Sequence, residues 1–380
     1  MKIALVTAYF YPFSNGGTEK YVLNLAKKLI SENNEVSIIT ANTRIFNISE
    51  YQNIKVYSFT NEFSLDVTID TDSCLNNKSE FKKFLDEQKY DVIHFHTLTP
   101  KFNISHFEIA KKTGAKIYFT AHIPAITCLH GDLMKFGQNA CDGLILKTRC
   151  TACYISKKGL NSFSSYILAK TIFFLNYPIT TAQAVKNKQT ELKKLNAICD
   201  RIYLFTHWQQ KVFTNNGFNI EKIILTNQFL DKSLRPQNII NKKIKQIGFV
   251  GRINEEKGLD ILIDAFIKSN RNDLRLNIAG INNNEIHLKE IQKRAKASTQ
   301  INWLFNLNQD DLIKFYKTID VLVIPSVTYE TGPFVLYEAI ENNLPILANN
   351  LGDMAIWKEK GFDLSLYNSE LELIELLKRL

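Results

Sequence analysis

The chain has 380 residues, of which 45% are hydrophobic and 22% are charged; the length allows two domains, and the composition is ordinary for a globular protein. It has no run of eighteen or more apolar residues and no leader-like start, so we expect a cytoplasmic protein, either free or at the inner face of the cell membrane. The net charge of +9 is uneven, with 25 Lys and Arg against 17 Asp and Glu up to residue 205, and 22 against 21 after it. Two explanations for the excess of basic residues up to residue 205 stay open: an anionic partner of this part of the chain, or a well-solvated basic face.

Short apolar runs alternate along the chain with amphipathic stretches, which is the pattern of parallel strands joined by helices. The predicted strands of a first sheet are Ile3–Thr7, Glu35–Thr40, Val92–His96, Lys116–Thr120, Arg201–Phe205 and Lys222–Leu225. Those of a second sheet are Gln246–Val250, Leu274–Ala279, Ile301–Leu304, Val321–Pro325 and Pro345–Ala348. Helix patterns between them include Glu19–Glu32, Gly258–Ile267, Asn308–Lys317 and Phe334–Asn342. The sequence therefore predicts an α/β fold with two doubly wound parallel sheets, in domains 1–235 and 236–380, joined by the lysine-rich segment Asp231–Lys245.

An insertion at about residues 125–195 interrupts the first domain, and its first part carries four cysteines. They are spaced C-x12-C-x8-C-x2-C, at Cys128, Cys141, Cys150 and Cys153. In a cytoplasmic chain such cysteines are free thiols or metal ligands rather than disulfides. Four thiolates with one C-x2-C pair can form a closed tetrahedral zinc site, with His130 as a substitute ligand. The alternative is four reduced thiols.

The second part of the insertion, Ile155–Lys194, is rich in Ser, Phe, Ile and Lys, with apolar residues crowded at Tyr166–Tyr177. This apolar stretch is too short to span a bilayer, which takes about 20 residues. Two interpretations stay open. The segment is either a helical hairpin packed on the first domain, or an interfacial segment that contacts a membrane surface.

The segment from Gly248 to Gly258 places two cations directly after a predicted strand. The strand ends at Val250, and a glycine-containing turn then presents Arg252 and Lys257 before a helix. Ligands of doubly wound folds bind at the carboxyl ends of the strands. Arginine offers a planar fork and lysine a compact charge for phosphate oxygens, so this turn predicts a phosphate site. The alternative is ordinary surface charge.

A second constellation follows the predicted strand Val321–Pro325. Glu330 lies in a loop, and Glu338 follows eight residues later in a predicted helix. We expect Thr331 to be the N-cap of that helix and Pro333 to lie in its first turn. The amides of that turn and the helix dipole favour an anion.

These motifs, and their order along nearly the whole chain, resemble family 4 of the retaining glycosyltransferases. That family has the GT-B fold, in which two Rossmann-like domains face each other across a cleft. Its glycine–arginine and lysine–glycine element matches Gly251-Arg252 and Lys257-Gly258, and its paired glutamates match Glu330 and Glu338. The resemblance implies a nucleotide-sugar donor whose diphosphate is bound by Arg252 and Lys257, whose sugar is held by Glu330, and whose ribose is held by Glu338. The further donor contacts it implies are Gly17, Gly251, Thr331, Gly332 and Pro333.

The resemblance also assigns roles in the first domain. The family's N-terminal glycine loop matches Pro12–Gly17, followed by a helix from Thr18; Gly16 and Gly17 allow the backbone close approach to a ligand, with Gly16 on the acceptor side. His122 follows a predicted strand, and the matching histidine of the family lies beside the transferred sugar. His94 and His96 alternate onto one face of the strand Val92–His96. We expect His96 to contact the acceptor and His94 to pack.

The mechanism that the resemblance implies retains the anomeric configuration, and the leaving phosphate takes the acceptor proton. It needs no cofactor and no divalent metal for catalysis. Asp70 and Asp72 could suggest a metal-bound diphosphate, but their polar context favours a loop. We expect a glycan acceptor, lipid-linked and growing at the membrane as in surface polysaccharide synthesis, and no nucleic acid, because no such binding motif is present.

The chain also departs from the family pattern. Asn343 stands where the family has a glycine, and asparagine can take the same left-handed cap. Relatives continue into a final helix that returns to the first domain, whereas this chain stops at Leu380. One alternative is therefore a non-catalytic or closure-defective homologue that acts as a binding protein. An epimerase or phosphorylase-like enzyme of the same fold is disfavoured by the paired glutamates.

Overall fold

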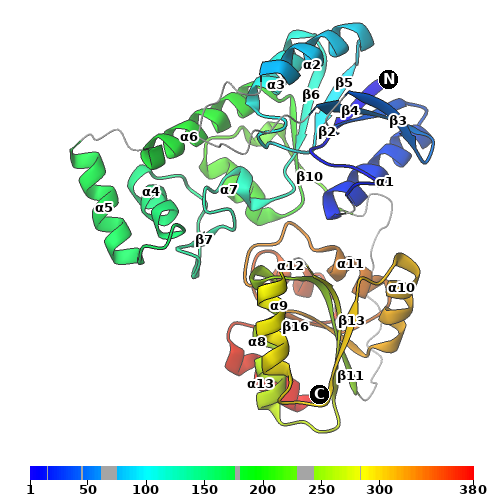
Figure 1. Cartoon of the computed structure of the whole chain (residues 1–380), viewed down its shortest axis with the longest axis vertical. Coiled ribbons are helices and arrows are strands. Elements are labelled where there is room, and N and C mark those ends of the chain that lie inside the picture. Colours follow the sequence, from blue (N-terminus) through cyan, green and yellow to red (C-terminus); the bar gives the residue numbers. More distant parts are fainter. Residues whose placement is uncertain (15, 44–45, 61–74, 176–179, 229–243, 283) are drawn as a thin grey trace. The chain divides into compact units, whose positions relative to one another are not determined.

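The computed structural model describes all residues except 15, 44–45, 61–74, 176–179, 229–243 and 283 (Figure 1). The chain divides into two compact units, Met1–Leu230 and Asp231–Leu380. The border predicted at 235/236 falls outside the described residues, as do Asp70 and Asp72.

The first unit is built on an eight-stranded sheet with the order β10-β9-β6-β5-β1-β2-β4-β3. Its strands are β1 (Lys2–Val6), β2 (Glu35–Thr43), β3 (Asn47–Tyr51), β4 (Ile54–Thr60), β5 (Val92–Phe95), β6 (Lys116–Thr120), β9 (Arg201–Leu204) and β10 (Ile223–Leu225). Its helices outside the insertion are α1 (Gly17–Ser31), α2 (Leu75–Gln88), α3 (Ile104–Lys112) and α7 (His207–Asn215). All described strand pairs are parallel except β3 with β4, which is antiparallel.

The order of this sheet reverses between β1 and β5. The chain leaves β1 for β2 on one side and later returns to β5 on the other side of β1. The loops after β1 and β5 therefore diverge at the carboxyl edge, where open α/β sheets bind ligands. β1 and β5 are buried almost throughout, as expected for strands covered by helices on both faces.

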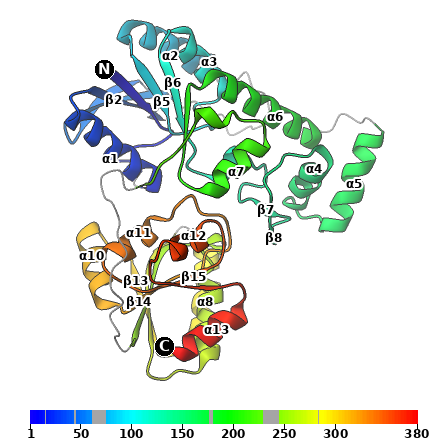
Figure 2. The same ribbon diagram turned by 180° about the vertical axis from the view of Figure 1, so that it is seen from behind.

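The insertion forms a two-residue hairpin of β7 (Met134–Lys135) and β8 (Asn139–Ala140), and three helices, α4 (Lys147–Ser156), α5 (Ser162–Phe174) and α6 (Thr180–Ile198). Helix α6 joins the main core of the unit through Leu192 and Leu195. Helix α5 packs on α4 and lies at the far end of the insertion from the sheet, as Figures 1 and 2 show from opposite sides. The insertion is therefore helical and is anchored to the unit through α6 rather than α5.

The second unit is a six-stranded parallel sheet with the order β13-β12-β11-β14-β15-β16. Its strands are β11 (Gln246–Ile253), β12 (Arg275–Asn282), β13 (Ile301–Phe305), β14 (Val321–Ile324), β15 (Ile346–Asn349) and β16 (Leu364–Tyr367). Its helices are α8 (Leu259–Ser269), α9 (Glu285–Ala295), α10 (Gln309–Thr318), α11 (Phe334–Glu341), α12 (Met354–Glu359) and α13 (Glu370–Arg379), with a short 3-10 turn η3 (Glu255–Lys257) before α8. Two separate apolar clusters pack in this unit. Its strand order reverses between β11 and β14.

All eleven predicted strands are present, with ends that differ from the prediction by at most three residues. Strands β3, β4, β7, β8 and β16 were not predicted, and the prediction of a wholly parallel first sheet was wrong at the β3–β4 hairpin. Asn343 has the predicted left-handed conformation, with φ of 57°. The two doubly wound α/β units are confirmed.

Candidate active site

In the second unit, the turn after β11 and the end of β14 are in direct contact. Gly258 has φ of +64°, and a Cβ atom at this position would lie 2.1 Å from the carbonyl oxygen of Pro325. The amide of Val327 donates to the carbonyl of Glu256 at 3.0 Å. Only glycine allows this approach with this backbone conformation. The contact brings together two loops that follow the strands on either side of the switch point.

Lys257 and Glu330, predicted to bind different parts of a donor, are joined to each other. The Lys257 ammonium donates to Oε1 of Glu330 at 2.5 Å, and the Ser326 hydroxyl donates to the same oxygen at 2.7 Å. Both charged side chains are 21% exposed. Burial raises the pKa of Glu330, but Lys257, Ser326 and Arg252 together outweigh it and hold the pKa below its usual range. Glu330 is therefore a carboxylate at neutral pH, and Lys257 keeps two further protons to donate.

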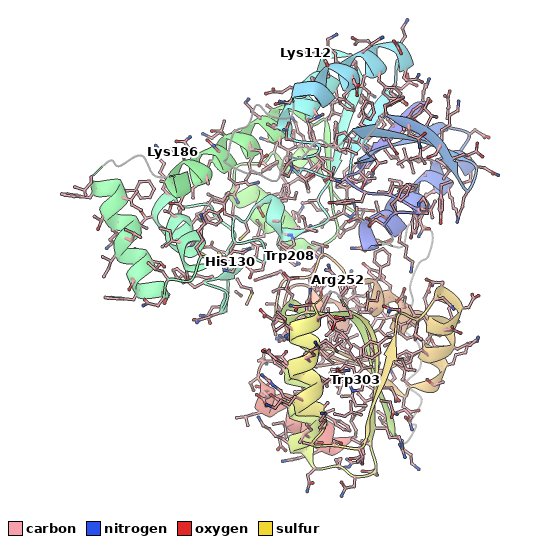
Figure 3. All side chains as sticks on the ribbon, viewed as in Figure 1. Lys112, His130, Lys186, Trp208, Arg252 and Trp303 are labelled. Carbon is pink, nitrogen blue, oxygen red and sulfur yellow. The ribbon has the colours of Figure 1, made fainter. Side chains whose placement is uncertain are left out.

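Arg252 lies on β11 itself, five residues before Lys257, and its side chain is exposed (Figure 3). Its charge acts on Glu330, since it contributes to lowering the pKa of that carboxyl. Gly251 precedes it and pairs with Gly280 of β12. Arg252, Lys257 and Glu330 thus form one charged cluster at the switch point of the second unit.

Glu338 lies in α11, as predicted, and accepts a hydrogen bond from the Tyr316 hydroxyl at 2.7 Å. Tyr316 comes from α10 and is buried. The prediction for the start of this helix was wrong: the N-cap is Pro333, and α11 begins at Phe334, so Thr331 does not cap it. Gly332 has φ of +92° and forms a turn after Thr331, so the helix starts only after Pro333. Thr331 is buried in the loop between Glu330 and the helix.

In the first unit, α1 begins at Gly17, with Gly16 as its N-cap, one residue before the predicted start. Glu19 is buried at this helix start, and its carboxylate accepts a hydrogen bond from the Ser14 hydroxyl at 2.5 Å. A Cβ atom at Gly16 would lie 2.7 Å from the Glu19 carboxylate. Glycine at position 16 therefore leaves room for an acidic side chain that suits the positive end of α1.

Three histidines gather at the carboxyl ends of β5 and β6. Nδ1 of His96 lies 3.1 Å from Nε2 of His122, and Nε2 of His94 lies 2.8 Å from the Thr120 hydroxyl. Nε2 of His96 is buried with no hydrogen-bond partner among the residues that the structure describes. Burial lowers the pKa of His122 to about 3, and burial together with the nearby His122 lowers the pKa of His94 to about 3. The imidazoles are therefore neutral at physiological pH.

Two aromatic rings enclose this histidine cluster. The ring of Tyr21, from α1, lies 5.1 Å from that of His122 and 5.8 Å from that of His96. Phe205 lies 5.2 Å from His122 and 5.1 Å from Tyr21. These rings exclude water from one side of the imidazoles, which explains why burial dominates their pKa values.

Comparison with known proteins matches two family models to the chain. Residues 15–161 match glycosyltransferase family 4, and residues 231–356 match glycosyl transferases group 1. A glycosyltransferase of Methanocaldococcus jannaschii is 26% identical over 93% of this chain and 82% of its own length. The chain belongs to glycosyltransferase family 4. A second relative, from Haemophilus influenzae, is 30% identical over 43% of this chain and 47% of its own length, and is also named a glycosyltransferase.

Solved structures agree on the fold of this glycosyltransferase. Anabaena HepE, in complex with UDP and glucose, has a TM-score of 0.64 at 14% identity and covers all of this chain and 89% of the HepE chain. WaaG, involved in lipopolysaccharide biosynthesis, has a TM-score of 0.59 at 13% identity and covers 99% of this chain and 90% of its own. The glycosyltransferase therefore has the GT-B fold.

The four cysteines of the glycosyltransferase's insertion line one cavity, together with His130 and Arg149. The amide of Gly131 donates to Sγ of Cys128 at 3.4 Å, and that of Phe136 donates to Sγ of Cys153 at 3.3 Å. Nδ1 of His130 instead lies 2.9 Å from Oδ1 of Asp132. Across the described part of the chain, no group of three or more His, Cys, Asp or Glu side chains is arranged to hold a metal ion. Burial raises the pKa of Cys153 to about 11, so the thiol is neutral.

Sequence reasoning missed several residues of this glycosyltransferase's two clusters. Ser326 stands two residues after the end of β14, so its place near the strand end was a usable signal. Tyr316 and Tyr21 gave no signal, because they contact Glu338 and His122 only through the packing of helices. No helix among the described residues is both long and apolar enough to cross a membrane.

Proposed function

We propose that the protein is a retaining, hexosyl-type glycosyltransferase that uses a nucleotide-sugar donor. The observation that carries the proposal is the cluster of Arg252, Lys257 and Glu330 at the switch point of the second unit. Anabaena HepE, a protein with the same fold, has been solved in complex with UDP and glucose. Two cations beside one ionised carboxylate suit a diphosphate joined to a hydroxyl-rich sugar.

In this proposal Arg252 and Lys257 bind the donor diphosphate and stabilise the negative charge that grows on it as the sugar leaves. Glu330 accepts hydrogen bonds from the sugar, and Lys257 fixes its orientation. Glu338, held by Tyr316, accepts from the ribose hydroxyls. Gly251, Gly332 and Gly17 line the donor site with backbone, alongside Thr331 and Pro333.

The neutral histidines define what the first unit can do in the reaction. An imidazole with a pKa of about 3 is not charged at pH 7, so His122 can give or accept one hydrogen bond but cannot supply a positive charge. We assign it to the transferred sugar, with His96 and Gly16 on the acceptor side. The leaving phosphate takes the acceptor proton, and no metal takes part.

The test is a thermal-shift titration with UDP, GDP and ADP and their sugar conjugates, in EDTA. Saturation at a hundred times the dissociation constant adds roughly 2.7 kcal/mol to the free energy of unfolding. We expect one nucleotide to stabilise the wild type but not Arg252→Ala. Failure of every nucleotide would favour the alternative, a non-catalytic or closure-defective homologue that acts as a binding protein.

We also propose that the acceptor is a glycan on a lipid carrier, as in surface polysaccharide synthesis, reached at a membrane surface through α5. Residues 155–194 carry seven lysines against one glutamate, which complements anionic lipid. Helix α5 buries Ser165, Ala169 and Ile172, whereas most of its large side chains are exposed. Those exposed are Phe163 (75%), Tyr166 (41%), Ile167 (50%), Leu168 (40%) and Phe174 (90%). An apolar helix flanked by lysines is typical of an interfacial anchor.

Co-sedimentation with phosphatidylglycerol vesicles tests this anchor. We expect the wild type to bind them and to bind phosphatidylcholine vesicles weakly. The double variant Phe163→Ser, Phe174→Ser should lose binding. The matched control is Ile286→Ser with Leu371→Ser, two equally exposed apolar positions of the second unit. Equal binding by both double variants would contradict the assignment.

The structural zinc expected from the cysteine spacing stays a prediction. Its support is that Cys128, Cys141, Cys150 and Cys153 line one cavity, and it requires their thiols to move together and ionise. Protein purified under reducing conditions should contain one zinc per chain by elemental analysis. Cys150→Ser with Cys153→Ser should lose it, whereas Cys199→Ser, a buried thiol outside this cavity, should retain it. Wild-type protein without stoichiometric metal would contradict the prediction.

A further inference from the structure

Lys101 is a buried cation in the loop that follows β5. Only 9% of it is exposed. Its ammonium lies 3.6 Å from the centre of the Tyr9 ring, and Tyr9 belongs to the loop that follows β1. The loop from β5 continues to Asn103, which caps α3. Lys101 thus connects the loop after β5 to the loop after β1, the two loops that diverge at the switch point of the first sheet.

No carboxylate among the described residues pairs with Lys101. Its contact with the Tyr9 ring is a cation–π interaction, which compensates only part of the cost of removing an ammonium from water. Burial alone lowers the pKa of Lys101 to about 8, with no contribution from a neighbouring charge. By contrast, the side chain of Lys111 in α3 is 42% exposed, and its ammonium donates a hydrogen bond to Asp200 at 2.8 Å. Lysine side chains are rarely buried in proteins without a paired anion. The burial of Lys101 without a carboxylate among the described residues therefore needs an explanation.

The position of Lys101 indicates where that anion would come from. Ligands of open α/β sheets bind at the carboxyl edge where the strand order reverses. The loop after β1 leads to Gly16, the N-cap of α1. The loop after β5 begins at His96, whose Nε2 is likewise buried without a partner in the described part of the chain. Two unsatisfied polar groups on one loop at this edge favour a ligand rather than a packing role.

We propose that Lys101, seated on Tyr9, binds a phosphate group carried by the acceptor. This rests on the proposed function, because it makes the first unit the acceptor side of a transferase. A phosphate supplies the negative charge that a neutral sugar lacks, and the Lys101 ammonium meets it as a compact point charge with three donors. The phosphate is either part of a lipid headgroup or a phosphate ester on a soluble glycan. The two sources share this chemistry and differ in the chain attached to it.

The test measures binding of two probes, inorganic phosphate and dihexanoyl phosphatidic acid below its micelle concentration. All proteins carry Arg252→Ala, so that phosphate bound in the second unit does not mask the result. In this background we compare Lys101→Met, Lys101→Arg and the control Lys112→Met. Lys112 is an exposed lysine at the end of α3, labelled in Figure 3. Loss of a hydrogen bond to a charged group predicts a roughly 10- to 100-fold weaker affinity in Lys101→Met.

We expect Lys101→Arg to recover much of the affinity and Lys112→Met to match the parent. Binding of both probes alike assigns a free phosphate ester, and binding of phosphatidic acid alone assigns a lipid headgroup. Equal affinity of Lys101→Met and the parent, or an equal loss in Lys112→Met, would overturn the proposal. The thermal-shift titration of the wild type with nucleotides is a separate measurement. If no nucleotide stabilises the wild type while phosphate binding depends on Lys101, then the donor assignment is wrong and the phosphate site stands.

Discussion

The two clusters differ in how they treat charge. In the second unit, Glu330 is held as a carboxylate and accepts a hydrogen bond from the Lys257 ammonium at 2.5 Å. In the first unit, His96 and His122 lie 3.1 Å apart and are both held neutral by burial. The strand edges that carry the two clusters are alike, so the difference comes from the side chains that the loops present.

This contrast teaches where the reaction can place its charge. A cluster of paired ions can exchange one partner for a diphosphate and remain compensated, whereas a neutral imidazole pair can only hold hydroxyl groups. Lys101 differs from both clusters, since it is a buried cation with no carboxylate partner among the residues that the structure describes.

Lys257→Ala should have the largest effect. Removing a donor aimed at the developing charge lowers the rate of transfer by about 100- to 1,000-fold. The control is Lys268→Ala, which removes a lysine with the same 2.5 Å geometry to a carboxylate, Glu370, on the surface of the same unit. Steady-state kinetics should leave the control within about twofold of wild type. Equal rates for both variants would show that the ion pair at Glu330 has no catalytic role.

Gly258→Ala tests whether the paired-ion cluster depends on the backbone contact beneath it. The new Cβ would clash with the Pro325 carbonyl in a left-handed conformation, and we expect a loss of about 2 to 4 kcal/mol in unfolding free energy. Gly114→Ala is the control, because Gly114 has φ of +84° but nothing within 4 Å of the added atom. It should cost about 1 kcal/mol. Urea denaturation measures both, and equal costs would refute the contact.

The pH dependence of stability probes the histidine cluster. The pKa of His94 and of His122 is about 3 in the folded protein and about 6.5 in an unfolded chain. The unfolded state therefore binds more protons below pH 6.5, and stability falls as the pH falls. At pH 5.5 each of these histidines should cost about 1.4 kcal/mol relative to pH 7.5. Urea denaturation of His122→Asn should show a shallower slope, while exposed His207→Asn should keep the wild-type slope. A flat wild-type profile would contradict the burial of these groups.

Tyr316→Phe should have the smallest effect. It removes the hydroxyl that donates to Glu338 at 2.7 Å, which costs about 1 kcal/mol of stability and weakens nucleotide affinity by about fivefold. Tyr337→Phe, another buried tyrosine on α11 itself, serves as the comparison. Thermal shift with the nucleotide that binds wild type separates the two. A larger loss of affinity in Tyr337→Phe would move the positioning role away from Tyr316.

The sequence singled out Arg252, Lys257 and Glu330, which the structure brings into one charged cluster, because their motifs are local to two strand ends. It could not predict that Lys257 pairs with Glu330, since that contact joins loops 73 residues apart. The β3–β4 hairpin was missed because its turn residues, Gln52 and Asn53, have positive φ without the glycine that signals such turns. The Thr331 cap was wrong because cap preference was considered without the backbone turn at Gly332.

The contact between Gly258 and Pro325 has a consequence for biosynthesis. β11 and β14 pair through only two residue positions, Ile247 with Val321 and Gly248 with Leu322. A ribosome that has released residues 246–258 has supplied both cations of the donor cluster but neither of its glutamates, and β12 and β13 must follow before β14 arrives. The proposed donor site therefore forms only after Glu338 has been synthesised. We expect a nucleotide added during synthesis to stabilise only chains that extend past Glu338. Stabilisation by a nucleotide would therefore report when the second unit has formed.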